Sequence, residues 1–132
     1  MPEITPTKTN SLRKLVQTKL SSVTGLSSST VFYMYADPPV MYPHATFTVE
    51  SVDLGDLSRQ DYTVDVDVWD KGPSAYRVEE LADLVEAKFT QQNLPQTTIL
   101  PTFYLESRRT ILDEDKSIRH IRVSMICQNY EV

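Results

Sequence analysis

The chain has 132 residues, of which 40% are hydrophobic and 23% charged, and its formal net charge is −5. This size and composition predict one globular domain over residues 1–132. The excess of acidic residues argues against tight binding of nucleic acid, which needs clustered Lys and Arg, and three glycines are too few for a phosphate-cradling loop. No apolar run approaches the roughly 18 residues of a membrane span, so no membrane contact is expected.

The first half of the chain predicts one helix and two strands. Residues 1–7 contain two prolines and are expected to form a flexible arm. Apolar side chains along one stripe predict a helix from about Ser11 to Ser22. Strands are predicted over 31–35 and 45–52, and the polar segment 53–61 is expected to be a connecting loop.

The clearest local signal is a strand, a turn and a helix in succession. Residues 62–69 alternate strictly between polar and apolar, Gly72-Pro73 breaks the pattern, and residues 74–91 continue with helical spacing. Ser74 is suited to cap the start of this helix. Two more strands are predicted over 102–110 and 117–130.

The predicted order is therefore helix, three strands, helix, two strands. Short connections favour antiparallel pairing of neighbouring strands, and two amphipathic helices most simply cover the sheet from one side. The expected fold class is α+β, with a mostly antiparallel sheet of about five strands and two helices packed on one face.

The residues of the chain whose types suit catalysis or metal binding are two aspartates, two histidines and one cysteine. Asp65 and Asp67 are predicted on the same face of a strand, about 6.5–7 Å apart, a spacing that could suit acid–base hydrolysis but also an ordinary polar sheet face. His44 and His120 lie far apart in the sequence and are interpreted as unrelated. No metal and no cofactor are expected. Cys127 shares the apolar parity of the last strand and is predicted to be buried.

Other polar residues have structural interpretations beside functional ones. Arg108 and Arg109 could contact an anion, but salt bridges to the acidic turn 113–116 are favoured. The same turn lacks the glycine and the terminal glutamate of a calcium loop. Trp69 is either a packing residue at the end of a strand or an interface anchor, and the sequence leaves both open.

The central and C-terminal segments resemble a known family. Residues 65–71 (DVDVWDK), followed after a spacer by residues 78–83 (VEELAD), resemble a strand and helix of the tail-completion, or head-to-tail joining, proteins of long-tailed bacteriophages, which include tail terminators. Residues 103–107 (FYLES), the acidic turn and the last alternating strand are similar to the same family. The resemblance covers about residues 31–130.

This resemblance implies a non-enzymatic virion protein, assembled in the host cytoplasm. It further implies a ring, commonly a hexamer, that ends tail growth and contacts the tail tube protein and the head connector. DNA would pass through the channel of the ring without specific binding. The isolated chain is expected to be a monomer, with loops 53–61 and 111–117 mobile until assembly.

The residues expected at interfaces between subunits or with the DNA channel are polar or aromatic: Asp56, Arg59, Asp65, Asp67, Trp69, Arg108, Arg109, Asp113 and Asp115. Two other functions are compatible with the sequence. One is a small hydrolase or ligand-binding α+β domain that uses Asp65 and Asp67. The other is an adaptor in a cellular complex.

Overall fold

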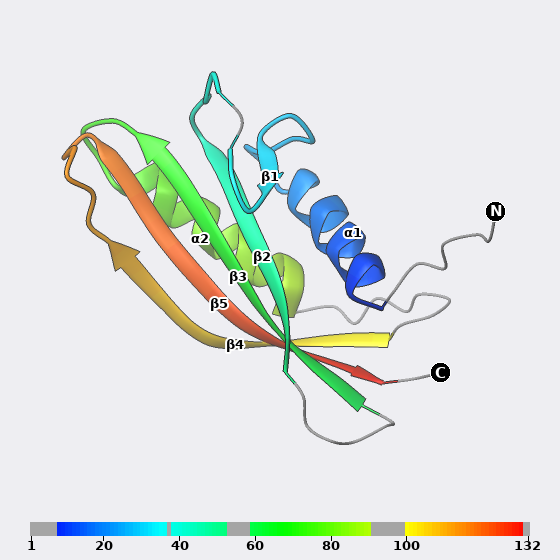
Figure 1. Ribbon diagram of the computed structural model, residues 1–132. Helices are drawn as coiled ribbons and strands as arrows, with labels where there is room; N and C mark the ends of the chain where they lie inside the picture. The colour runs from blue at the N-terminus through cyan, green and yellow to red at the C-terminus, as the bar shows by residue number, and fades with distance from the viewer. Residues whose placement is uncertain (1–7, 37, 53–58, 91–99, 131–132) are drawn as a thin grey trace.

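The computed structural model describes residues 8–36, 38–52, 59–90 and 100–130, which form two helices and five strands (Figure 1). In chain order these elements are α1 (Lys8–Ser21), β1 (Val31–Tyr33), β2 (His44–Val52), β3 (Arg59–Lys71), α2 (Tyr76–Thr90), β4 (Leu100–Ile111) and β5 (Ile118–Tyr130). The predicted arm 1–7 and most of the predicted loop 53–61 lie outside the described residues. Neither helix in the described ranges is long and apolar enough to cross a membrane.

The five strands form one sheet in the order β1-β2-β3-β5-β4, which confirms the predicted α+β class. All pairs are antiparallel except β1 with β2. The sheet is mostly antiparallel, as predicted, and β1 with β2 is the exception, since Val31 pairs with Ala45 in the parallel sense. Met34, with a φ of 71°, ends β1 after only three residues, and segment 34–43 is long enough to return the chain to the start of β2.

The strands in the middle of the sheet extend further than the alternation predicts. β3 pairs with β5 without interruption from Arg59 opposite Tyr130 to Lys71 opposite Ile118. This continuous ladder keeps residues at both ends of β3 extended, although their polar side chains give no strand signal by themselves. The predicted boundaries of the second helix are close to those observed, and Tyr76 N donates a hydrogen bond to the Ser74 hydroxyl at 3.1 Å, which confirms the predicted cap.

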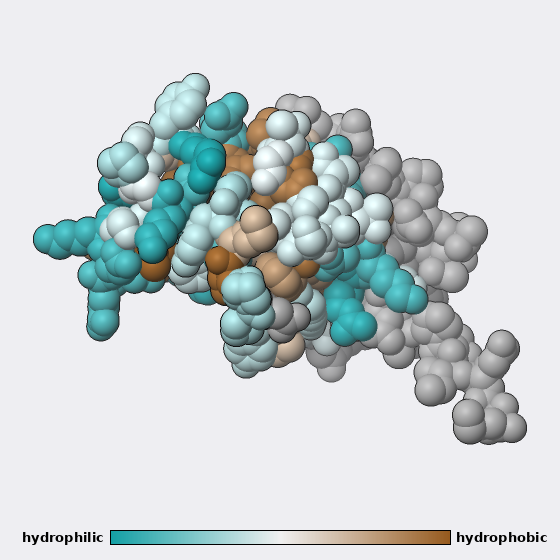
Figure 2. Space-filling view, turned by 90° about the horizontal axis from the view of Figure 1, so that it is seen from above, coloured by the Kyte–Doolittle hydropathy of each residue, from teal (hydrophilic) through white to brown (hydrophobic). Residues whose placement is uncertain are grey.

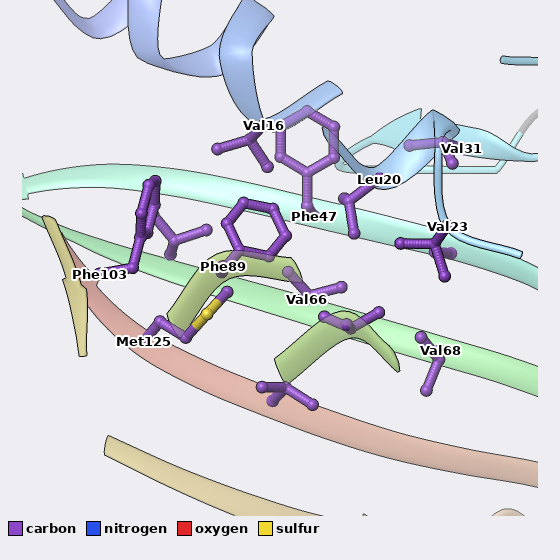
Figure 3. Packing of buried hydrophobic residues seen from close by; sticks show 14 of the residues in the cluster. Val16, Leu20, Val23, Val31, Phe47, Val66, Val68, Phe89, Phe103 and Met125 are labelled. Atoms are coloured by element: carbon purple, nitrogen blue, oxygen red, sulfur yellow. The ribbon is translucent and has the colours of Figure 1, made fainter. Parts of the chain in front are cut away.

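Both helices pack on one face of the sheet, as predicted. Alternate residues of the strands point to that face and form one core with the apolar stripes of α1 and α2 (Figure 3). In this core the Phe89 ring of α2 meets the Phe103 ring of β4 edge-on, with centroids 5.0 Å apart. Each buried ring removes a large apolar area from water, so the junction of α2 with the sheet is a main source of stability.

A buried lysine joins the two helices. Lys19 of α1 is 4% exposed, and its ammonium donates a hydrogen bond to the Lys88 carbonyl at 2.9 Å, in the last turn of α2. The ammonium also lies 5.3 Å from the centroid of the Phe89 ring. Burial and the nearby charge of Lys88 lower the pKa of Lys19. This contact satisfies a carbonyl that the helix itself leaves unpaired and places positive charge at the negative end of the helix dipole.

Candidate functional site

The sheet face opposite the helices, called the open face below, carries the remaining residues of each strand. The strand register sets its side chains in rows. One row holds His44, Trp69, His120 and Ile111, the next holds Thr46, Asp67, Arg122 and Arg109, and a third holds Thr48, Asp65, Ser124 and Ser107. Asp65, Asp67, Trp69 and Arg109, four of the residues that the sequence suggests for interfaces, are therefore brought together on one surface.

Three rings stack across the open face. The Trp69 ring lies between His120, at a centroid distance of 3.5 Å and an interplanar angle of 18°, and His44, at 5.9 Å and 7°. The two histidines are only 5% and 6% exposed. The interpretation of His44 and His120 as unrelated is therefore wrong, because the register of β2, β3 and β5 makes both of them neighbours of Trp69. Burial is the main cause that lowers the pKa of His44.

Asp67 is hydrogen-bonded to two side chains of β5 on this face. Its Oδ1 accepts hydrogen bonds from His120 Nε2 at 2.6 Å and Arg122 Nε at 2.9 Å, and its Oδ2 accepts one from Arg122 Nη2 at 3.4 Å. Burial raises the pKa of the Asp67 carboxyl, but the hydrogen bonds and charges of His120 and Arg122 outweigh it, so the pKa is lowered. Asp67 is thus an ionised carboxylate, and both of its oxygens accept hydrogen bonds.

This environment does not suit Asp67 for acid catalysis. A general acid among paired carboxylates needs a raised pKa, whereas that of Asp67 is lowered. A groove of about 490 Å³ lies between the start of α2, the end of β4 and the start of β5; His120 lines it, but neither Asp65 nor Asp67 does. Within the described residues, no group of three or more His, Cys, Asp or Glu side chains could hold a metal ion.

Figure 2 views the molecule from above Figure 1, with the turn between β4 and β5 toward the left. Hydrophilic side chains gather toward this turn, and apolar side chains show between them and the middle of the view. The lining of the groove includes the buried Val78 of α2 and Ile121 of β5, and Glu79, Lys116 and Arg119 contribute charge to it. The groove is therefore an apolar depression bordered by both signs of charge.

Arg108 and Arg109 point to opposite faces of the sheet. A β-bulge between Leu105 and Ser107 shifts the alternation by one residue, so that Arg108 lies on the helix side and Arg109 on the open face, opposite Arg122. Arg108 donates hydrogen bonds to Asp83 at 2.5 Å and Glu86 at 2.6 Å on α2. The predicted salt bridges from Arg108 to the acidic turn are therefore wrong, because the bulge turns its side chain toward α2.

The acidic turn is exposed and is organised by its own side chains. Asp113 accepts a hydrogen bond from the Asp115 amide at 2.9 Å, and Asp115 accepts bonds from the amide and hydroxyl of Ser117 at 2.9 and 2.7 Å. Both aspartates thus shape the turn, and their role as interface residues stays a prediction. Asp56 lies outside the described residues, and Arg59 is described only as the backbone position that begins β3.

Two further observations concern residues outside the open face. The prediction that Cys127 is buried is confirmed, and burial is the main cause that raises the pKa of its thiol to about 12.

An ion pair between Asp70 at the end of β3 and Arg77 in the first turn of α2 was not expected. Its signal in the sequence is an acidic residue before the turn and a basic residue just after it. The hydrogen bond from Arg77 is the main cause that lowers the pKa of Asp70.

Comparison with known proteins finds likeness in structure only. No protein-family model matches the sequence, and no curated protein matches it. A chain of the virion of a native gene transfer agent particle has a similar structure, with a TM-score of 0.71 and 10% sequence identity, over 87% of this chain and 91% of that chain. A second solved structure, whose name states no function, has a TM-score of 0.65 and 12% identity, over 92% of this chain and 91% of that chain. At such identities the likeness establishes a shared fold over nearly the whole length.

Proposed function

We propose that this chain is a structural virion protein of the tail-completion type, which caps the head-proximal end of a phage tail and joins it to the head connector as a ring, commonly of six copies. The observation that carries the proposal is the match to a virion chain over 87% of this chain and 91% of that one. The resemblance of residues 65–71 and 78–83 to tail-completion proteins supports the same role independently.

The arrangement of side chains suits a role in assembly. Asp67, His120 and Arg122 hold one another on a sheet face that also carries the half-exposed Trp69. Large apolar side chains are exposed beyond β1 and along β4, including Tyr35 at 77% and Tyr104 at 51%. Exposed apolar groups at both edges of one sheet suit a subunit that has a neighbour at each edge.

The proposed partners are further copies of this chain, the tail tube protein and the head connector. DNA passes through the ring without specific binding, which the net charge of −5 favours because acidic surface repels phosphate. The protein acts without catalysis and is incorporated into the virion in the host cytoplasm. The hydrolase alternative is less favoured, since Asp67 is engaged by His120 and Arg122 and lies outside the groove.

The decisive experiment is to make particles without this chain and examine them by electron microscopy. We expect filled heads and unattached tails, because the joint between them is missing. Supplying the intact chain in trans is the control and restores joined particles. Complete, infective particles made without the chain would refute the proposal.

A further inference from the structure

The sheet has a strand edge with unpaired positions on each side. β4 is an edge strand, and within the described residues only β5 pairs with it. At the other edge, β1 covers β2 only from Ala45 to Phe47, so residues 48–52 of β2 extend beyond it. Backbone groups of an edge strand are available to pair with another strand.

The directions of these two edges are compatible with repeated pairing. β2 is antiparallel to β3, β3 to β5, and β5 to β4, so β2 and β4 run in opposite directions. Copies related by rotation about an axis along the strands would therefore bring β4 of one copy against β2 of the next in the antiparallel sense. A ring needs two different surfaces that fit each other, and the two edges provide them.

The β-bulge limits the part of β4 that can take part. The bulge lies between Leu105 and Ser107, so the regular edge after it is 107–111, the same length as the uncovered segment 48–52. Antiparallel alignment of these two segments puts Glu50 opposite Arg109 at the centre. Both side chains lie on the open face and are exposed.

The same alignment keeps every side chain on its own face of the sheet. Val49 and Thr110 would be opposed on the helix side, and Thr48 and Ile111 on the open face. A shift by one residue would oppose groups from different faces, which an antiparallel ladder does not allow. Register and charge therefore favour the same pairing, because a carboxylate and a guanidinium directly opposite each other stabilise a cross-strand pair.

We propose that residues 48–52 of one copy pair antiparallel with residues 107–111 of the next, with Glu50 against Arg109, so that the sheets of neighbouring subunits join around the ring. This inference rests on the proposed function and names the surface through which the chain binds itself.

Disulfide cross-linking in assembled particles tests the pairing. The Cα atoms of directly opposed residues in an antiparallel pair are about 4.5–5.5 Å apart, within the range of a disulfide. Particles with the double substitution Glu50→Cys and Arg109→Cys should, after oxidation, give a ladder of covalent multimers on a non-reducing gel. The native Cys127 is buried and does not compete. The matched control is Glu50→Cys with Glu114→Cys, because Glu114 is exposed in the turn beyond β4 and should give no ladder.

Charge reversal provides a second measurement that does not depend on oxidation. Glu50→Arg or Arg109→Glu alone should reduce incorporation of the chain into particles, and the two together should restore it. Particles that contain the chain and show neither a ladder nor this rescue would overturn the pairing, while the proposed function would stand. Absence of the chain from purified particles would refute the proposed function and the pairing with it.

Discussion

Replacing Asp67 by Asn tests whether the charge of this carboxylate stabilises the open face. The substitution keeps the size of the side chain and one oxygen acceptor, but it removes the negative charge that His120 and Arg122 face. The Asp67 side chain is 12% exposed and that of Arg122 is 36% exposed, so solvent screens the pair only in part. Hydrogen bonds to a charged group contribute about 1.5–3 kcal/mol and neutral ones about half of that.

We therefore expect Asp67→Asn to lower the free energy of unfolding by about 1–2 kcal/mol at pH 7. For a domain of this size this corresponds to a decrease in Tm of roughly 5 °C. The measurement is urea unfolding followed by circular dichroism, with thermal unfolding as a check. Asp65→Asn is the matched control, because Asp65 is half-buried on the same strand face and lies in the next row. It should have a smaller effect.

The pH dependence of the Asp67→Asn effect has a definite sign. The pKa of Asp67 is lowered in the folded chain relative to its usual value of 3.8. Its stabilising contribution is therefore fully present above the pKa of the unfolded chain and is lost as the pH falls through the lower, folded value. The difference between wild type and Asp67→Asn should be largest above about pH 5 and decrease below about pH 4. An equal difference at pH 3 and pH 7, or none at pH 7, would refute this account of the open face.

Three further predictions concern the core. Phe89→Ala should cost about 3–5 kcal/mol of unfolding free energy in urea titrations, because it leaves a cavity against Phe103; a loss below 1 kcal/mol would contradict the packing described. Gly25→Ala should cost about 1–2 kcal/mol by the same assay, since Gly25 has a φ of 98° and a Cβ there would lie 3.1 Å from Leu81 Cδ2; an unchanged midpoint would count against this. Cys127 should react with a thiol reagent at pH 8 only as fast as the chain opens, because it is buried and its pKa is about 12; rapid labelling without denaturant would be inconsistent with that burial.

Local sequence determines most of the elements of this protein. The change of period at Gly72-Pro73 marks the end of β3 and the start of α2, because alternation, turn residues and helical spacing act over a few neighbouring residues. The apolar parity of β5 likewise correctly predicts that Val123 and Cys127 face the core. The fold class follows from these local patterns, since two amphipathic helices and several amphipathic strands have few ways to bury their apolar faces.

The open face could be predicted only in part. Placing Asp65, Asp67 and Trp69 on one side of a strand requires only the alternation of β3. Their partners come from other strands, and strand register depends on contacts between residues distant in sequence. The stack of His44, Trp69 and His120 and the hydrogen bonds of Asp67 are therefore visible only in the folded chain.

Tertiary structure alone also decides the parallel pairing of β1 with β2 and the bulge in β4. Adjacent strand residues point to opposite faces, and the bulge decides that Arg108 faces α2 while Arg109 lies on the open face. Local periodicity sets which segments become helices and strands, because it reflects the geometry of one element at a time. The register between elements sets which side chains meet, because it depends on how the whole core is packed.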